Sequence, residues 1–445
     1  MEHDGCKGCK YEKCSEDSKE CRGCKQNAVD KYTRMTHADH IRSMTDEELA
    51  KANKDCKNIE DNYHNNEQAC KIFINSIYGA MANKFYYNSN IAMAESITLQ
   101  GQDLIKYSVK VVNYYFNQLW PGDDVAHTKV ADYMKKKFAD FDINKFMEYA
   151  TQPVQFGETL QIYGDTDSAY ISLQPVIDAC NIPIEQETEF VLAINECVLA
   201  EYLEKMFDRY AEKFNCPKNL EKFELEKIAR AVIMLAKKKY IMDISWKEPD
   251  VHVPPCHSLV YKGIEVIQGS TPDFCRDCMK EFIKFMLEKI DSGVKPDYDS
   301  IVRKLKELKI KFGMQNPNEI SKSFGMSDYE KYILDDKREI KYVPDTVCPI
   351  HVRAAAIYNN MLYNKAKRYK SKYNIIHKGD KVKFYYTADN GVFAFLPNEF
   401  PGEFAPKMDI DQQFEKMVLE PLNRIIEAAG YPKVSSALTF SVGLW

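Results

Sequence analysis

Apolar and polar residues alternate along residues 161–173, and a short tip that carries Gly, Asp and Thr interrupts the alternation. This pattern predicts two β-strands joined as a hairpin. The tip contains Asp165 and Asp167, which are two residues apart. Side chains at positions i and i+2 of a strand point to the same face, so both carboxylates can face one site.

The two carboxylates of this tip repel each other at neutral pH unless a cation lies between them. Hard divalent ions with phosphate-bearing substrates are held in this way, by one or two carboxylates and by substrate oxygens. We therefore interpret the tip as a Mg²⁺ site. The alternative is an acidic turn that faces water, because Asp is common in turns.

A helical period occurs upstream, where the apolar residues from 70 to 77 follow the spacing i, i+3, i+4, i+7. Lys71, Asn75 and Tyr78 fall on a different face of the same helix, and Gly79 leaves room beside them. A lysine in such a position suits a triphosphate as a point charge. By periodicity alone, the better explanation is an ordinary amphipathic helix with a solvated lysine.

The remaining patterns outline the secondary structure of the chain. Thr45 and Glu48 have the spacing of a capping box, which marks a helix start. The predicted elements are helices over 30–80 with a break near residue 45, over most of 84–117 and over 185–215, a strand at 231–235, and helices with short strands from 262 to 430.

Composition and charge limit the function. Apolar residues make up 45% of the chain, and no apolar run approaches the ~18 residues of a membrane-spanning helix. Nothing resembles a signal peptide, and the mostly scattered cysteines indicate a reducing compartment. The net charge of −5 argues against a protein that coats nucleic acid nonspecifically, but it does not exclude a basic groove.

Two clusters of positive charge are candidates for such a groove, although a single charge run is usually a solvated helix face. The first is interleaved with tyrosines and contains Asp380 as its only acidic residue; it consists of Lys365, Lys367, Arg368, Lys370, Lys372, Lys378, Lys381 and Lys383. The second is left open, because it overlaps an amphipathic helical pattern; it consists of Arg303, Lys304, Lys306, Lys309 and Lys311.

Residues 1–29 are polar and rich in cysteine. Their two Cys-x-x-Cys pairs match a Zn²⁺ site with four thiolates, and so short a segment needs such a staple to fold. The candidate ligands are Cys6, Cys9, Cys21 and Cys24. The alternative is a disordered leader with free cysteines. A further pair, Cys275 and Cys278, lies in a predicted helix without a partner pair, and we interpret it as structural.

The run Tyr-Gly-Asp-Thr-Asp-Ser at 163–168 resembles motif C of the family B DNA polymerases, the palm hairpin that holds catalytic metal ions. The resemblance implies that Asp167 is the essential metal ligand and that Asp165 is a supporting carboxylate. Two Mg²⁺ ions would be held at a site shared with a partner chain.

The pattern Lys-x-x-x-Asn-Ser-x-Tyr-Gly at 71–79 resembles motif B in the fingers of the same family. By this likeness Lys71 contacts the incoming triphosphate and Asn75 lines the nucleotide site. Tyr78 and Gly79 would pack against the nascent base pair.

A third likeness is Ala-Lys-Lys-Lys-Tyr at 236–240, which is similar to the family's Lys-Lys-Arg-Tyr motif. Lysine at the third place loses bidentate geometry but keeps the charge. The resemblance implies that Lys237, Lys238, Lys239 and Tyr240 touch the primer-template backbone. In the same context, backbone contacts by the thumb are expected for Lys365, Lys367, Arg368 and Lys370.

The resemblance implies an α+β fold with the right-hand polymerase architecture: partial fingers, a palm with an antiparallel sheet and a mostly helical thumb. Weaker likenesses at 262–272 and 348–353 resemble thumb segments of tailed-phage replicative polymerases. The expected domains are a Cys-rich segment at 1–29, partial fingers at 30–83, the palm at 84–261, the thumb at 262–430 and a tail at 431–445.

Three family features are absent from the sequence: the motif A pattern Asp-x-x-Ser-x-Tyr-Pro, the basic first fingers helix and the acidic motifs of a proofreading exonuclease. The chain therefore resembles the C-terminal part of a polymerase. Either a separate N-terminal chain supplies the motif A aspartate and the exonuclease, or the sequence is truncated. The initial Met1 and the added cysteines favour a separate chain.

The expected function is template-directed DNA synthesis in the cytoplasm of an infected bacterium. The primer 3′-hydroxyl would attack the α-phosphate of a dNTP and expel pyrophosphate. The expected partners are primer-template DNA, dNTPs and the N-terminal chain, with no membrane. One alternative is a noncatalytic DNA-binding or scaffold fragment. Another is a metal-dependent nuclease, which would need further carboxylates nearby and would leave motif B unexplained.

The last residues, 437–445, are short and apolar and follow a helix break at Pro432. Phe440 and Trp445 are candidate anchors for a partner's pocket. The position matches the clamp-binding tail of tailed-phage polymerases, so we expect a sliding clamp as a further partner. The alternative is that the tail folds back onto the thumb.

Overall fold

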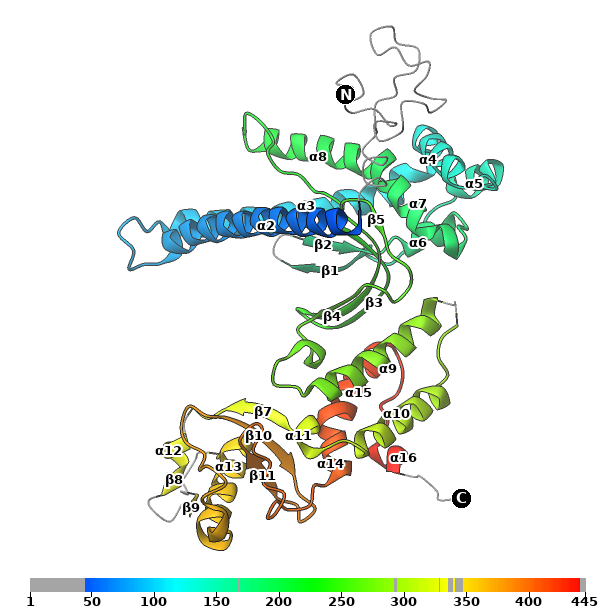
Figure 1. Ribbon diagram of the computed structural model, residues 1–445. Helices are drawn as coiled ribbons and strands as arrows, with labels where there is room; N and C mark the ends of the chain where they lie inside the picture. Colours follow the sequence, from blue (N-terminus) through cyan, green and yellow to red (C-terminus); the bar gives the residue numbers. More distant parts are fainter. Residues whose placement is uncertain are drawn as a thin grey trace, which may run out of the picture. The chain divides into compact units, whose positions relative to one another are not determined.

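The computed structural model describes residues 45–165, 168–291, 294–327, 329–334, 339–340 and 347–440. It divides into two compact units, Met1–Leu104 and Ile105–Trp445. Figure 1 shows the described elements with their labels. Helices predominate and the sheets are small and antiparallel, which agrees with the predicted α+β class.

The first unit is a helical hairpin made by α2 (Asp46–Ala82) and the beginning of α3 (Ile91–Tyr114). The capping box is confirmed: the Thr45 amide donates to Glu48 Oε2 over 2.8 Å, and the Glu48 amide donates to Thr45 Oγ1. At the other end, the Asn90 amide donates to the Met81 carbonyl and closes the connection. These local bonds explain where α2 begins and where the chain turns back.

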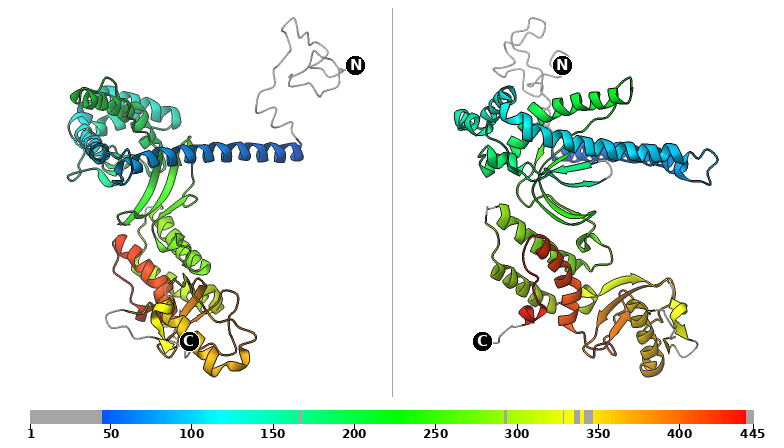
Figure 2. Two further views of the ribbon diagram at one scale, coloured as in Figure 1. Left: turned by 90° about the vertical axis from the view of Figure 1, so that its left-hand side faces the viewer. Right: turned by 180° about the vertical axis from the view of Figure 1, so that it is seen from behind.

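The second unit begins with a helical layer around one hydrophobic core. Its helices α4 to α7, coloured cyan to green, lie together in all three views (Figures 1 and 2). Large aromatic side chains, among them Phe116, Trp120 and Phe190, are fully buried there. The helices are α4 (Asp124–Lys137), α5 (Ile143–Ala150), α6 (Gln174–Ala179), α7 (Glu187–Ile194) and α8 (Ala200–Lys213).

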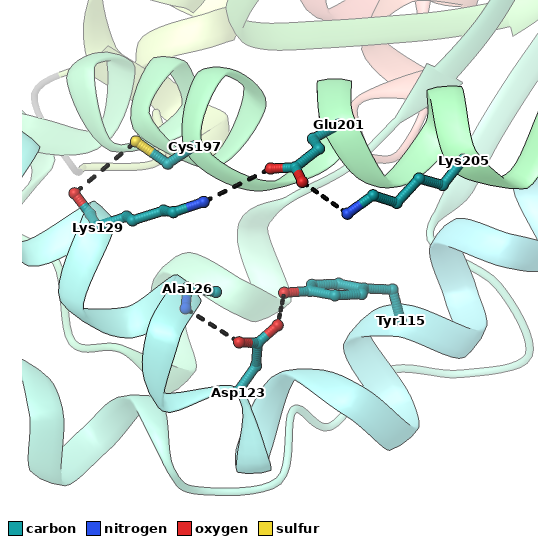
Figure 3. Close-up of polar contacts among 7 residues, drawn as sticks. All are labelled: Tyr115, Asp123, Ala126, Lys129, Cys197, Glu201 and Lys205. Carbon is teal, nitrogen blue, oxygen red and sulfur yellow. Dashed lines mark hydrogen bonds and ion pairs between the residues drawn. The ribbon is translucent and has the colours of Figure 1, made fainter.

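The predicted long helix over 185–215 is present, but a π-helical turn at Asn195–Leu199 divides it into α7 and α8. Polar contacts across this layer are drawn in Figure 3. Asp123 caps α4 by accepting the Ala126 amide, and it also accepts the Tyr115 hydroxyl over 2.9 Å. Lys129 on α4 lies 3.5 Å from Glu201 on α8. The last of these contacts joins α4 to α8, but as an ion pair open to water it adds little stability.

Two antiparallel hairpins follow in the same unit. β1 (Gln161–Asp165) pairs with β2 (Ser168–Ile171), which confirms the predicted hairpin. The predicted strand at 231–235 is part of the longer β3, and the second sheet consists of β3 (Lys227–Ala236), β4 (Lys239–Lys247), β5 (Val251–His252) and β6 (Leu259–Lys262), in the order β3-β4-β5 with β6 also paired to β4.

The rest of the chain builds a second core that is rich in helices. Cys275 and Cys278 are buried in it, which agrees with their interpretation as structural residues. Its helices are α9 (Asp273–Asp291), α10 (Tyr298–Gly313), α11 (Pro317–Ile320), α12 (Tyr329–Tyr332), α13 (Ile350–Asn360), α14 (Ile410–Phe414), α15 (Glu420–Ala428) and α16 (Ser436–Phe440). Its strands are β7 (Lys322–Gly325), β8 (Ile333–Leu334), β9 (Glu339–Ile340), β10 (Lys381–Tyr386) and β11 (Val392–Phe395).

The sheet of this core has the order β11-β10-β7, and α13 packs against β11 and β10. Toward the C-terminus, the Asn423 side chain bonds to both the amide and the carbonyl of Val434 over 2.9 Å. Thr439 on α16 is 1% exposed, and its carbonyl accepts a bond from Lys309 on α10. The described part of the tail therefore folds back onto the helices. Residues 441–445 lie outside the described residues.

The described helices also bear on membrane association. No helix among residues 45–440, apart from the masked gaps, combines the length and the apolar character that crossing a membrane would need.

Candidate active site

The β1–β2 hairpin places Asp165 at its tip. Asp165 pairs with Ser168 as the last residue pair of the ladder, and the Ser168 hydroxyl donates to the Asp165 carbonyl. The side chain of Asp165 is 30% exposed. Thr166 and Asp167 complete the tip and lie outside the described residues, so the predicted metal ligand Asp167 stays a prediction.

The lysine motif forms the turn of the neighbouring hairpin, between β3 and β4. Lys238 has a left-handed backbone with φ of 62°, a conformation that ordinary side chains seldom adopt. Its amide donates to the Tyr163 hydroxyl over 2.8 Å. A Cβ atom on Gly263 would lie 2.2 Å from the Lys238 carbonyl oxygen, so the chain can pass beneath this turn only with glycine there. The Tyr163 hydroxyl and the backbone at Gly263 thus both contact this turn.

Three tyrosines hold the two hairpins together. The hydroxyls of Tyr170 and Tyr240 are 2.8 Å apart, and their ring centroids are 5.6 Å apart. Tyr163 packs against both rings. Burial and the bond to Tyr170 raise the pKa of Tyr240 above its usual value, so its hydroxyl stays protonated at neutral pH. Tyr240 is therefore a packing residue of this interface in addition to its predicted place in the lysine motif.

This packing brings the lysine turn close to the tip of the β1–β2 hairpin. Lys238 Nζ lies 3.6 Å from Asp165 Oδ1, and 61% of the lysine side chain is exposed. An ion pair so open to water stabilises the fold by at most about 1 kcal/mol. The contact therefore places a cation beside the carboxylate more than it holds the protein together. Of the predicted site residues, the structure brings Asp165, Lys238 and Tyr240 together.

The donors at this tip fit a hard divalent ion only in part. The Asp165 carboxylate supplies oxygen ligands of the kind that Mg²⁺ prefers. In the described part of the chain, however, no group of three or more His, Cys, Asp or Glu side chains is arranged to hold a metal. A full ligand set would therefore require groups beyond the described residues.

Motif B lies on α2 in the first unit. Lys71, Asn75 and Tyr78 are exposed on one side of the helix, as the spacing predicts. The Tyr78 hydroxyl is 2.6 Å from Thr98 Oγ1 on α3, which fixes the ring near the turn that joins α2 to α3. Nothing lies within 4 Å of the Cβ position of Gly79. Among the described residues, the space beside Gly79 is therefore open.

The first basic cluster combines exposed cations with aromatic rings. Lys370 Nζ lies 3.6 Å from the ring centroid of Tyr363, and Arg368 lies over Tyr369 at 4.8 Å. Lys365 and Lys367 are exposed in the same turns. Cations over rings keep their charge accessible while the stem is packed. This arrangement suits contact with a phosphate backbone.

The second basic cluster, on α10, is largely engaged within the protein. Lys304 and Lys311 both lie 2.7 Å from Glu281 on α9, and Lys309 lies 2.6 Å from Asp411. The apolar residues of α10 face the core. The two clusters, similar in sequence, thus differ in structure, and α10 is a structural helix.

Three contacts at the site escaped the sequence reasoning. The roles of Tyr163, Tyr170 and Gly263 depend on residues far along the chain. Only the cross-strand pairing of Tyr163 with Tyr170 in the hairpin could have indicated the roles of these two tyrosines. Two predicted sites lie outside the described residues: the cysteines Cys6, Cys9, Cys21 and Cys24, and the tail anchor Trp445.

Comparisons with known proteins agree with the family that the sequence resembles. Residues 40–332 match DNA polymerase family B. The chain is 22% identical to the DNA-directed DNA polymerase of Enterobacteria phage T4 over 90% of this chain and 41% of that protein. It is 24% identical to the DNA-directed DNA polymerase of Escherichia phage RB69 over 66% of this chain and 28% of that protein. A shorter match, at 22% identity over 49% of this chain and 16% of the relative, is to a DNA polymerase catalytic subunit of Psittacid herpesvirus 1. The chain thus spans less than half the length of these relatives.

Proposed function

Because this chain belongs to DNA polymerase family B, we propose that it carries part of the active site for template-directed DNA synthesis. One observation carries the proposal: the lysine turn is docked on the motif C hairpin. The Lys238 amide binds the Tyr163 hydroxyl, and the Lys238 ammonium lies 3.6 Å from Asp165. Acidic and basic groups are thus set side by side where a metal-bound nucleotide and a primer would meet.

The proposed site residues have different roles in DNA synthesis. Asp165 and Asp167 would hold divalent ions, on which family B polymerases generally depend, and these ions would stabilise charge on the attacking and leaving oxygens. Lys71 would bind the triphosphate, and Asn75, Tyr78 and Gly79 would line the nucleotide site. Lys237, Lys238 and Lys239 would bind the primer-template backbone close to the reaction. The protein's own contribution is mainly positioning.

The subdomain assignment is part of the same proposal. We assign α2 to the fingers, residues 84–261 to the palm and residues 262–430 to the thumb. The exposed basic and aromatic cluster around Lys365, Lys367, Arg368 and Lys370 would then be the thumb's contact with duplex DNA.

The sequence contains no motif A pattern, so the proposed active site would need a further aspartate. We propose that a separate N-terminal chain supplies the motif A aspartate and the exonuclease. The chain's coverage of 41% of the phage T4 polymerase is consistent with this. A nuclease is less well supported, because it would leave the motif B residues Lys71, Asn75 and Tyr78 unexplained.

The test is primer extension with purified components. The chain alone should bind a labelled primer-template and extend it poorly or not at all, because an open two-carboxylate site holds Mg²⁺ weakly. Addition of the N-terminal polymerase chain from the same genome should restore nucleotide incorporation. Robust extension by the chain alone would refute the need for a partner. DNA binding without extension by the pair would favour the scaffold alternative.

Two further assignments remain proposals. The set Cys6, Cys9, Cys21 and Cys24 would bind one Zn²⁺ per chain, which metal analysis of protein purified without added zinc would detect. Clamp binding by the tail would have to use residues 441–445, because α16 is already packed on α10. Deletion of those residues should then remove the processivity gained from the cognate clamp.

A further inference from the structure

Glu189 on α7 is a carboxylate that faces three polar side chains from two other elements. From α4, the Tyr133 hydroxyl donates to Glu189 Oε2 over 3.3 Å, and Lys137 Nζ lies 3.2 Å from the same oxygen. From β5, His252 Nε2 lies 3.3 Å from Glu189 Oε1. The Glu189 side chain is only 15% exposed, and a carboxylate so far from water needs partners of this kind. These contacts join α4, α7 and β5 at one point.

An apolar contact accompanies this polar cluster. Trp246 on β4 and Leu192 on α7 are buried together, and Tyr133 packs against them. The Trp246 indole N–H donates to Asp250 over 2.9 Å, and Asp250 Oδ1 lies 3.6 Å from His252 Nε2. The sheet of β3 to β6 is thus attached to α4 and α7 at the end of β4 where Trp246 lies.

The same helical layer carries the β1–β2 hairpin. Leu160, directly before β1, is buried in the core of this layer, and Leu173, after β2, packs against that core. Phe190, the neighbour of Glu189 on α7, belongs to the core as well. The lysine turn lies at the opposite end of β4 from Trp246. Both hairpins are therefore attached to one layer at their far ends, and their near ends meet at the tyrosine contacts.

The length of β4 makes the lysine turn sensitive to its far attachment. β4 (Lys239–Lys247) has 9 residues and is roughly 30 Å long. A tilt of about 2° at one end of a stiff strand of this length moves the other end by about 1 Å. Misplacement of about 1 Å near reacting groups can slow a reaction by about 10²-fold. A contact at the far end of β4 can therefore affect the rate without touching substrate.

We propose that Glu189 is a positioning residue of the polymerase site, because it ties the sheet that carries the lysine turn to the helical layer that carries the motif C hairpin. The inference rests on the proposed function. Tyr133 and Lys137 belong to the segment 121–158, which contains none of the predicted site residues. In this arrangement α4 serves the site by fixing Glu189. The competing role for the cluster is stability alone.

The Lys238 amide reports this positioning in the isolated chain, because it donates to the Tyr163 hydroxyl on the other hairpin. Its hydrogen exchange is measurable by NMR of protein labelled with ¹⁵N-lysine. Glu189→Gln keeps the size and one acceptor oxygen but removes the charge. It should speed exchange of this amide about three- to tenfold, because a less firmly attached sheet lets the turn open more often. Tyr163→Phe removes the acceptor and should give an increase at least as large.

Glu201→Gln is the matched control for the loss of a glutamate–lysine pair. Glu201 on α8 lies 3.5 Å from Lys129 on α4, so this substitution removes another ion pair of α4 (Figure 3). The other ion pair of Glu201 is with Lys205 on the same helix. Because neither lysine belongs to the sheet, exchange at Lys238 should not change.

His252→Ala is the second variant, since it removes the contact from the sheet and leaves Glu189 with its two partners on α4. The His252 side chain is 44% exposed, so the fold should tolerate its loss. Exchange at Lys238 should again be about three- to tenfold faster, and this variant decides the question if Glu189→Gln is unstable in urea. Exchange in His252→Ala equal to that in Glu201→Gln, with faster exchange in Tyr163→Phe, would overturn the inference.

Kinetics of the assembled polymerase distinguish positioning from stability alone. Glu189→Gln should lower kcat about tenfold and leave the apparent KM for dNTP nearly unchanged, because Glu189 acts through the sheet and not on the nucleotide. Lys238→Ala added to this variant should cause little further loss, since one residue acts through the other. Multiplication of the two separate losses in the double variant would show that Glu189 acts elsewhere, and would overturn the inference.

The two measurements also separate this inference from the proposed function. Faster exchange at Lys238 in the variants, with no extension by the assembled wild-type polymerase, would contradict the proposed function and support the attachment of the sheet through Glu189. Unchanged exchange in Glu189→Gln and His252→Ala, in a polymerase that extends DNA, would overturn the inference and leave the proposed function intact.

Discussion

The apolar stripe of α10 is buried by the chain itself, whereas no residue of α2 is buried. Both helices have apolar residues at three- and four-residue spacing, and both carry lysines on their polar sides. On α10, Leu305, Leu308 and Phe312 are fully buried. On α2, Phe73 and Ile77 are exposed. Periodicity therefore predicts that a face will be covered, but it does not say by what.

The lysines of the two helices differ in the same way. Those of α10 are committed to Glu281 and Asp411. No described carboxylate forms an ion pair with Lys71 on α2, and its side chain is exposed. Residues of one type thus maintain the fold on α10 and remain available to a ligand on α2. The comparison separates residues that stabilise this chain from residues that serve its proposed chemistry, and that separation can be tested.

The largest effect is expected at the tip of the β1–β2 hairpin, where Asp167 should serve the proposed chemistry and not the stability of the fold. Asp167→Ala in the assembled polymerase should reduce nucleotide incorporation by about 10³-fold or more, because it removes a metal ligand. DNA affinity and the thermal midpoint should hardly change. Rapid-quench incorporation assays and fluorescence anisotropy with labelled primer-template measure the two quantities. Near-normal turnover would show that the metal site is elsewhere.

The next effect concerns stability and contrasts the two stripes directly. Phe312→Ala should lower the free energy of unfolding by about 3–5 kcal/mol, because it leaves a cavity in a closed core. Phe73→Ala should lower it by less than about 1 kcal/mol, because the ring is already exposed. Urea denaturation of each purified variant provides the measurement. A large loss of stability for Phe73→Ala in the isolated chain would mean that part of this chain covers the apolar stripe of α2.

Local structure was predictable wherever the determining residues are close in sequence. The alternation of residues 161–173 predicted the β1–β2 hairpin, and the capping box predicted where α2 begins. The π-helical turn between α7 and α8 was not predictable, because no turn residue marks it. The face of α2 that carries Lys71, Asn75 and Tyr78 was predictable from their spacing. The exposure of the apolar residues of α2 was not, because α10 has the same apolar spacing and its apolar residues are buried.

The candidate site shows the same limit more sharply. The motifs identified Asp165, Lys238 and Tyr240 separately. Their meeting depends on the bond between Tyr163 and Lys238, which are 75 positions apart. It also depends on Gly263, which has no Cβ atom and so lets the chain pass beneath the lysine turn. Alternation indicates which face of a strand a side chain occupies, but it does not indicate which distant element lies against that face. That information came from the packing of the two hairpins.

A smaller effect distinguishes the lysines of the two helices. Lys71→Ala should weaken nucleotide use by the assembled polymerase about 10- to 100-fold, mainly through a higher apparent KM, because a charge on the triphosphate is lost. It should leave the stability unchanged. Lys304→Ala should leave KM unchanged and cost about 1 kcal/mol of stability, because it removes one partner of Glu281. Steady-state kinetics and denaturation of both variants test this pair, and an exchange of the two outcomes would invalidate the comparison.

The smallest effect is the pH dependence of the ion pairs that fix α10 to α9. Partial burial opposes ionisation of Glu281, but hydrogen bonds from Lys304 and Lys311 outweigh it and lower the pKa of the carboxyl below its ordinary value of 4.5. A carboxyl whose pKa is lower in the folded state contributes stability that is fully present above 4.5 and is lost as the pH falls through the folded value. The Glu281 side chain is 39% exposed, so this contribution should be about 1 kcal/mol or less.

Glu281→Gln isolates this contribution from the titration of other carboxyls. The wild type should be more stable than the variant near neutral pH, and the difference should shrink toward zero as the pH falls below 4.5. Glu67→Gln on the exposed helix α2 is the matched control, and it should change stability little at any pH. Urea midpoints measured across this range decide the question. If the Glu281 difference stayed constant with pH, the lysine pairs would not be what holds α10 to α9, and the contrast with α2 would depend on the buried apolar residues alone.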